Sequence, residues 1–383
     1  MQRIKVAHVL HTFLPVTENW IFNQLHYNDA CDHLVISQFL KNESLFPVKT
    51  LYSACEGEFR QKIFKQISRM KIWPFQSFYN SIICKEMPHI IHGHFSTESC
   101  RVINVASQHK IPLVTTFYGL DVNKLPRRKY WKKKYASLFK TGSAFIVEGH
   151  HMANKLVEIG CDPQKINVIH IGIDIERIRK KLSRFRTDEP VFKILFIGLE
   201  REKKGAMDAA RAFCGLLKSF PDAELHMVGE GKYRKQAQEY FKDNGCLSRV
   251  IFHGMVNVDR YHELLALCDV VLAPSCTAAD GDTEGGAPVV CIEAQAAEKV
   301  VISTNHCDIP EIVLHQKGGL LCNEHDVDQL TRNLLLMAQN PQLRNRMGQQ
   351  GYAHVQKNHS IEKQVTKITS IYRNIMENTN ERS

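Results

Sequence analysis

Two glutamates, Glu284 and Glu293, lie in a segment rich in small residues that spans residues 273–310. Glu284 stands in a glycine-rich loop after a predicted strand, and Glu293 stands in the first turns of a predicted helix. A carboxylate accepts hydrogen bonds from hydroxyl groups, small residues let backbone N–H groups approach a ligand, and a helix N-terminus favours a diphosphate. Two carboxylates at this spacing could hold the two ends of one nucleotide sugar. The alternative is a solvated loop followed by a helix with an acidic first turn.

The segment resembles the glutamate-containing signature of retaining glycosyltransferases of the group 1 (GT4) family, which have the GT-B fold. The resemblance implies that Glu284 contacts the donor sugar, that Glu293 contacts the nucleotide ribose, and that the loop between them supplies backbone N–H groups. Eight residues separate the two glutamates where the family usually has seven, because an extra glycine lengthens the loop. The loop residues assigned to the nucleotide sugar are Gly285, Gly286, Ala287, Pro288 and Val289.

A basic loop matches the same family. Residues 192–198 and 202–205 resemble the strand and loop that place basic side chains on the donor diphosphate. The resemblance implies that Lys204, with Arg201 or Lys203, stabilises the charge growing on the leaving diphosphate, and electrostatic stabilisation of this kind is usually the largest contribution to catalysis.

Two positions depart from the family pattern. Leu199 occupies the place of the family's diphosphate arginine, so Arg201 or Lys203 would have to supply that charge. Tyr118 stands where the N-terminal domain usually has a histidine, although its hydroxyl can still hydrogen-bond a sugar. The remaining matches extend the resemblance to nearly the whole chain. They include Gly229 at a strand end, Gly254 and Val256 beside the base, and residues 92–95, 115–122, 170–174 and 306–311.

Three residues of the N-terminal half follow predicted strands and are candidates for contact with donor or acceptor. His94 ends a strand, although one histidine among 19 is more often structural. Asp121 would orient an acceptor hydroxyl or cap the next segment, and the sequence supports both roles equally. Thr17 would face the ligand or cap a helix. Its turn contains no Gly-x-Gly-x-x-Gly, which disfavours a dinucleotide site.

These residues need a scaffold of alternating strands and helices. Short runs rich in Val and Ile alternate with amphipathic stretches such as 59–72 and 152–159, which predicts βαβ units and parallel sheets covered on both faces. The predicted strands span residues 5–11, 33–39, 89–95, 112–117, 144–148 and 166–171 in the first half, and 192–197, 223–228, 250–252, 270–273, 300–303 and 319–322 in the second.

The restart of this pattern predicts an α/β GT-B architecture of two doubly wound, Rossmann-like domains that face a cleft. Residues 1–180 would form the N-terminal acceptor-binding domain, and residues 190–359 the nucleotide-sugar-binding domain. Residues 177–190 are densely charged and are interpreted as the linker. Asn340 would cap a helix that begins with proline, and a last helix over 360–376 would pack back on the N-terminal domain.

Charge is distributed unevenly along the chain. Residues 1–190 hold 28 basic and 16 acidic residues, against 22 and 24 in residues 191–383. Two basic stretches with interleaved aromatic residues, 59–75 and 124–140, favour contact with an anionic membrane surface, although each could be a solvated helix face. Nucleic acid is not predicted, because no nucleic-acid-binding motif accompanies the charge.

Neither a signal peptide nor a membrane-spanning segment is apparent, and a cytoplasmic protein, peripheral on the inner face of the membrane, is expected. The twelve cysteines, among them Cys214, Cys268 and Cys291, have no Cys-x-x-Cys spacing and are interpreted as free buried thiols. No metal site is predicted, since Asp280 and Asp282 more often represent a solvated loop pair.

The resemblance therefore implies retaining transfer of a sugar from a nucleoside-diphosphate sugar to an acceptor hydroxyl, without a metal or other cofactor. A UDP-sugar is the favoured donor, and a glycan or glycolipid intermediate of bacterial surface-glycan synthesis is the favoured acceptor. Two alternatives remain open: a sugar-nucleotide epimerase of the same fold, and a non-catalytic nucleotide-binding subunit, which Leu199 makes conceivable.

Overall fold

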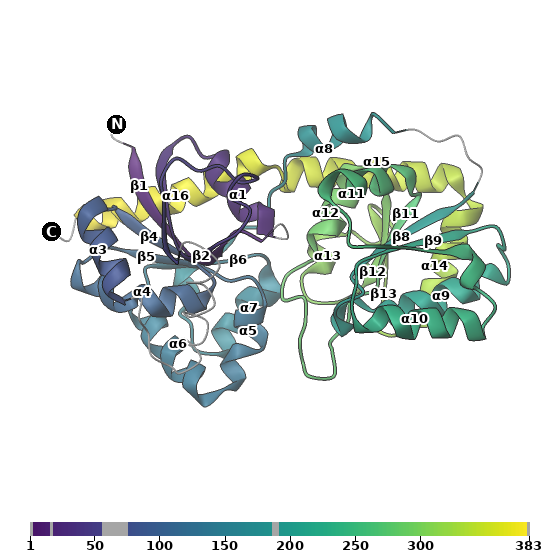
Figure 1. Cartoon of the computed structure of the whole chain (residues 1–383), viewed down its shortest axis with the longest axis horizontal. Helices are drawn as coiled ribbons and strands as arrows, with labels where there is room; N and C mark the ends of the chain where they lie inside the picture. The colour runs from purple at the N-terminus through teal and green to yellow at the C-terminus, as the bar shows by residue number, and fades with distance from the viewer. Residues whose placement is uncertain (1–2, 16–17, 56–75, 186–190, 381–383) are drawn as a thin grey trace. The chain divides into compact units, whose positions relative to one another are not determined.

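Parallel β-strands divide between two sheets, one in each of two units (Figure 1). The computed structural model describes residues 3–15, 18–55, 76–185 and 191–380. One unit consists of Met1–Gly172 with Ile361–Ser383, and the other consists of Ile173–Ser360. The predicted pair of parallel-sheet α/β units is confirmed, whereas the predicted cleft concerns their relative placement and stays a prediction. The predicted helix over 59–72 lies outside the described residues.

The N-terminal sheet has the strand order β3-β2-β1-β4-β5-β6-β7, with all neighbouring pairs parallel. Its strands are β1 (Ile4–Phe13), β2 (Cys31–Leu40), β3 (Leu51–Cys55), β4 (Ile90–His94), β5 (Leu113–Thr116), β6 (Ala144–Val147) and β7 (Ile166–Val168). The helices described in this unit are α1 (Asn19–His26), α3 (Gln76–Glu86), α4 (Ser96–Gln108), α5 (Leu120–Asn123), α6 (Lys129–Thr141), α7 (His150–Glu158) and α16 (Ile361–Asn380).

Helices cover both faces of this sheet. Along β1, Ala7 and Val9 pack into a buried cluster with residues of α3, α4, α6 and α7, whereas Val6 packs with Tyr372 of α16. Successive side chains of a strand point to opposite faces, so a strand covered on both sides must be apolar at nearly every position. This is why the central strands could be predicted from short apolar runs.

The C-terminal sheet has the order β10-β9-β8-β11-β12-β13, again with parallel neighbours. Its strands are β8 (Lys193–Ile197), β9 (Glu224–Val228), β10 (Val250–Gly254), β11 (Val270–Ala273), β12 (Val300–Thr304) and β13 (Gly319–Cys322). The α-helices of this unit are α8 (Ile175–Leu182), α9 (Ala206–Leu217), α10 (Lys232–Asp243), α11 (Val258–Leu267), α12 (Val289–Ala296), α13 (Ile309–Ile312), α14 (Val327–Gln339) and α15 (Pro341–Asn358).

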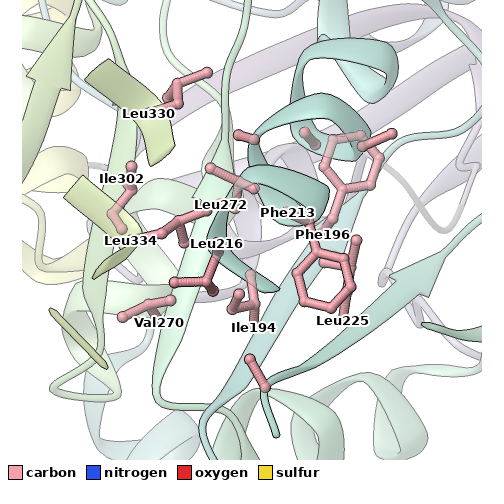
Figure 2. Close-up of a cluster of buried hydrophobic side chains, with 14 of the residues drawn as sticks. Ile194, Phe196, Phe213, Leu216, Leu225, Val270, Leu272, Ile302, Leu330 and Leu334 are labelled. Atoms are coloured by element: carbon pink, nitrogen blue, oxygen red, sulfur yellow. The ribbon is translucent and has the colours of Figure 1, made fainter. Parts of the chain in front are cut away.

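One large apolar cluster holds the C-terminal unit together (Figure 2). Phe213 and Leu216 of α9 and Leu334 of α14 are fully buried and pack with strand residues such as Ile194 and Val270. Burying a side chain of this size stabilises the fold by about 1.5–3 kcal/mol. The cluster thereby fixes the strands whose carboxyl ends lead into the candidate site loops.

Three local features differ from the sequence-based prediction. Strand β3 was not predicted, because its residues are mostly half-buried and form no continuous apolar run. The predicted linker over 177–190 is wrong for its first part, which belongs to α8; the carboxylate of Asp174 caps this helix, and Ile175 and Ile178 are buried. The side chain of Asn340 does not cap α15 but donates to the Leu336 carbonyl at 2.9 Å.

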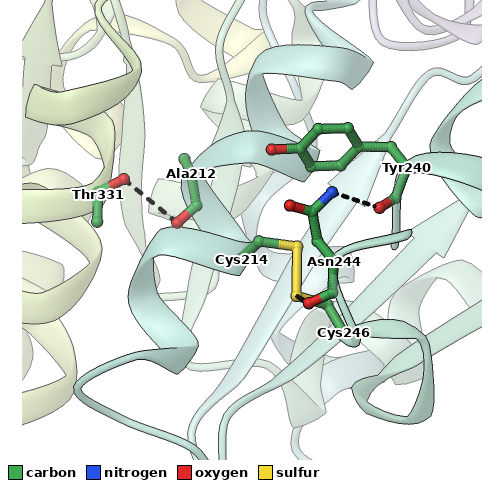
Figure 3. The surroundings of a disulfide bond; sticks show 6 residues. All are labelled: Ala212, Cys214, Tyr240, Asn244, Cys246 and Thr331. Carbon is green, nitrogen blue, oxygen red and sulfur yellow. Dashed lines mark hydrogen bonds between the residues drawn. A yellow bond between two sulfur atoms is a disulfide. The ribbon is translucent and has the colours of Figure 1, made fainter. Parts of the chain in front are cut away.

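The interpretation of all the cysteines as free thiols is wrong for one pair. Cys214 of α9 and Cys246, which follows α10, form a disulfide with a Cα–Cα distance of 6.0 Å (Figure 3). The two lie 32 residues apart in sequence, and packing of α9 against α10 brings them together. The remaining ten cysteines are free, and burial raises the pKa of most of their thiols, as at Cys268 and Cys291.

Candidate functional site

The basic side chains of the C-terminal unit follow β8 on a 3-10 turn, η4 (Glu202–Lys204). Gly205 ends the turn with a φ of +70°, and a Cβ there would lie 1.9 Å from the carbonyl oxygen of Pro274. A Cβ at Gly198 would lie 2.6 Å from the side chain of Lys204. Glycine at position 205 therefore allows the β8 loop to pass this close to the segment that follows β11, and glycine at position 198 leaves room for the Lys204 side chain.

This approach pairs the two lysines with the first glutamate of the glycine-rich loop. Lys204 Nζ lies 2.9 Å from Glu284 Oε1, and Lys203 Nζ lies 3.7 Å from Glu284 Oε2. Ser275 Oγ donates to Glu284 Oε1 at 3.0 Å, and the Glu284 amide donates to His306 Nε2 at 3.1 Å. The Glu284 side chain is only 6% exposed. Residues that follow β8, β11 and β12 thus converge on one carboxylate.

The lysines control the ionisation of Glu284. Burial alone would raise the pKa of this carboxyl, but the Lys204 and Lys203 ammonium groups outweigh burial and hold the pKa below its ordinary value. Glu284 is therefore ionised at neutral pH and can accept hydrogen bonds from ligand hydroxyls. The same ammonium groups lie at a carboxyl edge of the sheet, where α/β folds bind their ligands, and could neutralise an anionic group.

The rest of the basic loop is divided between solvent and core. Arg201, with a side chain 55% exposed, lies 3.3 Å from Asp282, and Lys203 lies 3.6 Å from the other oxygen of the same carboxylate. Asp282 is thus paired with two cations. The sequence had instead predicted a solvated pair of Asp280 and Asp282. Leu199 is fully buried in the apolar cluster, so charge at this edge comes from the residues that follow it.

Glu293 lies on α12 and contacts a tyrosine that sequence reasoning did not single out. Tyr261 of α11 donates its hydroxyl to Glu293 Oε2 at 2.5 Å. Burial raises the pKa of Glu293 from its ordinary 4.5 to about 7, and the hydrogen bond from Tyr261 opposes this only in part. Near neutral pH the carboxyl is therefore partly protonated, unlike Glu284.

The other predicted nucleotide-sugar residues lie at the ends of neighbouring strands. Gly229 follows β9 with a φ of +118°, and Gly254 ends β10 with a φ of +69°. Val256, two residues further, is half-buried. In the glycine-rich loop, residues 285–288 are buried and Val289 begins α12. The Gly285 amide donates to Thr283 Oγ1 at 3.2 Å, and the Gly286 carbonyl accepts from the Asp308 amide.

The candidates of the N-terminal half belong to the other unit. His94 ends β4, is fully buried, and lies 2.7 Å from the Tyr118 hydroxyl through its Nδ1. Both carboxylate oxygens of Asp121 accept backbone N–H groups, from Ser96 at 2.9 Å and Tyr118 at 3.0 Å, which favours the capping role over the acceptor role. Burial raises the pKa of Asp121 to about 6. Thr17 lies outside the described residues.

Two clusters of side chains with metal-ligating atoms occur among the described residues, although the sequence spacing predicted none. One consists of His8, His92 and His94, and the other of Asp208, Cys276 and His325. In the second cluster, His325 Nδ1 lies 2.8 Å from Asp208 Oδ2, an ordinary ion-pair distance. Each cluster combines residues from distant parts of the sequence, so a search for short ligand spacings could not find it.

Family models match most of the chain. The model described as glycosyl transferases group 1 matches residues 174–354, and the model described as glycosyltransferase family 4 matches residues 56–177. The first covers the lysine–glutamate cluster, a name used here for Lys203, Lys204, Ser275, Glu284 and His306. The second covers His94 and Asp121.

Curated relatives include glycosyltransferases of bacterial exopolysaccharide synthesis and also a glycogen synthase of Mycobacterium tuberculosis. The amylovoran biosynthesis glycosyltransferase AmsK of Erwinia amylovora is 34% identical over 230 residues, which are 59% of this chain and 55% of that protein. The putative colanic acid biosynthesis glycosyltransferase WcaL of Escherichia coli K12 is 28% identical over 227 residues, which are 59% of this chain and 55% of that protein. The matched region therefore spans little more than half the length of these relatives.

Solved structures agree in fold. Anabaena HepE, crystallised in complex with UDP and glucose, superposes with a TM-score of 0.77 over 96% of this chain and 99% of its own, at 16% identity. Identity at this level supports the fold alone. The expected GT-B architecture is confirmed in this sense, because glycosyltransferases of that fold are the structural neighbours.

Proposed function

Because the chain belongs to the group 1 glycosyltransferases, we propose that it transfers a sugar from a nucleoside-diphosphate sugar to an acceptor hydroxyl with retention of anomeric configuration. In this reaction the bond between the anomeric carbon and the diphosphate oxygen breaks, and a bond to the acceptor oxygen forms. The diphosphate leaves with the electron pair of the broken bond, and the proton of the acceptor hydroxyl passes to the leaving diphosphate or to water. The protein must therefore neutralise charge that grows on the diphosphate.

The observation that carries the proposal is the lysine–glutamate cluster. Lys204 and Lys203 would bind the diphosphate, with exposed Arg201 available as a third cation, and Glu284 would then accept hydrogen bonds from the donor sugar. Glu293 would accept hydrogen bonds from the ribose hydroxyls. Side-chain cations thus supply the charge that a divalent ion supplies in other transferases.

A UDP-sugar is the proposed donor, a choice supported by the UDP and glucose bound to the structurally similar HepE. Thermal unfolding of the full chain with UDP-, GDP- and ADP-glucose tests it, because ligand binding to the native state raises the melting temperature. We expect UDP-glucose to stabilise the wild type and to stabilise Lys204→Met much less. Lys235→Met, an exposed lysine of α10, is the matched control and should behave as wild type. Equal stabilisation of both variants would contradict the assigned diphosphate site.

A non-catalytic subunit is the second candidate, since the buried Leu199 occupies the position of the family's diphosphate arginine. Sugar release or transfer measured beside the binding assay separates the two functions. Tight nucleotide binding without turnover of any donor would favour the subunit. Conversion of the donor to an isomeric sugar nucleotide without added acceptor would instead favour the epimerase.

We propose a glycolipid or polysaccharide intermediate of bacterial surface-glycan synthesis as acceptor, bound at the inner face of the cytoplasmic membrane. The relatives in amylovoran and colanic acid synthesis support the pathway class. Helix α6 supports membrane contact: Lys132 and Lys133 are exposed, Tyr130 is 50% exposed, and Leu138 and Phe139 anchor the opposite side in the core. None of the described helices is long and apolar enough to cross a membrane. The basic stretch 59–75 lies outside the described residues.

Flotation with liposomes that contain or lack anionic phospholipid tests the membrane proposal. We expect binding to anionic liposomes only, and a decrease when Lys132 and Lys133 are replaced by Glu, because each surface cation contributes about 1 kcal/mol. Binding that ignores lipid charge would contradict the proposal.

A further inference from the structure

A row of hydrogen bonds crosses four neighbouring strands of the N-terminal sheet. His33 of β2, His8 of β1 and His94 of β4, here called the histidine row, lead to Tyr118, which follows β5. His33 Nε2 lies 2.9 Å from the carbonyl oxygen of Asn28, and His33 Nδ1 lies 2.9 Å from His8 Nε2. His8 Nδ1 lies 3.0 Å from His94 Nε2, and His94 Nδ1 lies 2.7 Å from the Tyr118 hydroxyl.

The first contact fixes the direction of every other hydrogen bond. A backbone carbonyl only accepts, so His33 Nε2 must carry its proton and donate to Asn28. A neutral imidazole has one N–H, so His33 Nδ1 accepts from His8 Nε2, and by the same rule His8 Nδ1 accepts from His94 Nε2. His94 Nδ1 is then an acceptor, and its partner must be the donor. The Tyr118 hydroxyl therefore points its proton at His94.

The rings are neutral because they are buried. Burial lowers the pKa of His8 and His94 well below the ordinary value, and the neighbouring histidines lower both further. Burial also lowers the pKa of His33, although the carboxylates of Asp32 and Asp29 oppose it. Two charged rings in one row would leave donors facing donors, so a single chain of neutral rings satisfies each nitrogen.

The hydrogen-bonded arrangement also argues against a metal ion held by His8, His92 and His94. His8 Nδ1 and His94 Nε2 are directed at each other with a proton between them, not at a common point. The nitrogens of His92 are engaged elsewhere, by the hydroxyl of Tyr372 at 2.6 Å and by Thr116 Oγ1 at 2.7 Å.

Tyr118 lies at the carboxyl edge of the sheet, where parallel sheets bind their ligands, and its side chain is partly exposed. Its hydroxyl oxygen donates its proton to the row and interacts with the Thr116 side chain, which leaves one lone pair of the oxygen. Burial is the main reason why the pKa of Tyr118 is raised, and the nearby side chains of Glu148 and Glu18 raise it further. Burial raises the pKa of Glu18 to about 7, so near neutral pH this neighbour is partly protonated. The Tyr118 oxygen is therefore the acceptor at this edge that the hydrogen bonds orient toward a hydroxyl donor.

We propose that the histidine row positions the Tyr118 hydroxyl with its proton directed at His94, so that the remaining lone pair of its oxygen accepts a hydrogen bond from a sugar hydroxyl. The three histidines are positioning residues, and Tyr118 alone touches the ligand. The choice of a sugar as ligand rests on the proposed function, whereas the orientation of the hydroxyl follows from the hydrogen bonds alone.

Long-range ¹H–¹⁵N correlation spectra of the full chain at pH 7.5 test the orientation directly, because they distinguish the two neutral tautomers from the imidazolium. We expect His33, His8 and His94 all to be protonated at Nε2 only. An Nδ1–H tautomer or an imidazolium at any of the three would overturn the proposal. Single replacements of each histidine assign the signals.

Two variants of His33, which is remote from the ligand edge, separate positioning from a merely structural role. His33→Asn keeps an acceptor for His8 Nε2, whereas His33→Leu removes it and frees His8 and His94 to adopt either tautomer. We expect His33→Leu to mix the tautomers and to raise the KM for UDP-glucose or for the acceptor roughly 5-fold with little change in kcat, the loss of one hydrogen bond. His33→Asn should restore both readouts.

Equal losses in the two variants would overturn the positioning role. The proposed function fails separately: if the wild type turns over no donor while its tautomers are as expected, the orientation of Tyr118 stands and the sugar transfer does not.

Discussion

Replacing Glu293 by glutamine should stabilise the protein while it weakens nucleotide binding. The carboxyl is buried against Tyr261, and its pKa is raised from 4.5 to about 7. The folded state therefore retains the proton at pH values where the unfolded chain has lost it. Stability must fall as the pH rises from about 4.5 to 7 and stay low above that range. Glutamine has the same shape, still accepts from Tyr261, and never has to ionise.

The size of the effect follows from the same two pKa values. At about 1.4 kcal/mol for each pH unit between them, the ionised carboxylate costs about 3 kcal/mol above pH 7. Relaxation of the surrounding protein and water penetration reduce this to about 2 kcal/mol. For a unit of this size, 1 kcal/mol shifts the melting temperature by about 2–4 °C. Glu293→Gln should thus melt roughly 4–8 °C above wild type at pH 8 and close to it at pH 5.

Differential scanning fluorimetry at both pH values, with and without UDP, measures the two effects together. UDP should stabilise Glu293→Gln less than wild type, because an amide replaces a carboxylate opposite the ribose hydroxyls. Glu239→Gln removes an exposed charge of α10 and is the control, with little expected change. A lower melting temperature for Glu293→Gln at pH 8, or the same shift at both pH values, would refute the argument from burial.

Three further outcomes follow from other parts of the two units. Gly205→Ala should destabilise the C-terminal unit by about 2 kcal/mol or more in urea unfolding and abolish UDP-dependent stabilisation. The reason is that the left-handed backbone of Gly205 and the adjacent Pro274 carbonyl leave no room for a Cβ. An unchanged free energy of unfolding would contradict the close loop contact. Donor binding near pH 4.5, the ordinary pKa of a glutamate, should take up protons, because a diphosphate that occupies Lys204 weakens the interaction that holds the Glu284 pKa low. The uptake is measured as a buffer-dependent heat in titration calorimetry, and heats independent of the buffer would argue against that exchange. The N-terminal unit should lose stability as the pH falls below about 6.5, because the unfolded chain binds protons that the folded unit excludes. The loss is up to about 1.4 kcal/mol per pH unit for each buried histidine such as His8 and His92. Urea midpoints that stay constant between pH 7 and 5 would contradict this expectation.

The central strands were predictable because burial on both faces requires a short run of apolar residues. The elements that were not predicted lack such a run. Edge strand β3 has one neighbour and mostly half-buried residues, so it forms no apolar run. Helix α8 presents its buried Ile175 and Ile178 among four basic residues, and the charge density hides the helical spacing. Local pattern thus identifies elements in the interior of each sheet better than those at its margins.

The site was predictable in residue types but not in pairings. Motif spacing pointed to Lys204 and Glu284, which lie 80 residues apart, yet only the strand order brings them within 2.9 Å. Tyr261 could not be assigned to Glu293, because no local pattern relates α11 to α12. The histidine row could not be predicted for the same reason. Its strands lie in the order β2-β1-β4 in the sheet, and this order differs from their order in the sequence.

The two units solve one electrostatic problem in different ways. Each must keep polar groups at the carboxyl edge of a sheet whose interior is apolar, where an unpaired charge is costly. The C-terminal unit pairs opposite charges, so Lys204 can exchange Glu284 for an anionic ligand with little net desolvation. The N-terminal unit holds neutral rings in a directed row that ends at Tyr118 and needs no counter-ion. A charged diphosphate therefore suits the first edge and an uncharged hydroxyl the second, which agrees with the proposed transfer from a nucleotide sugar to an alcohol.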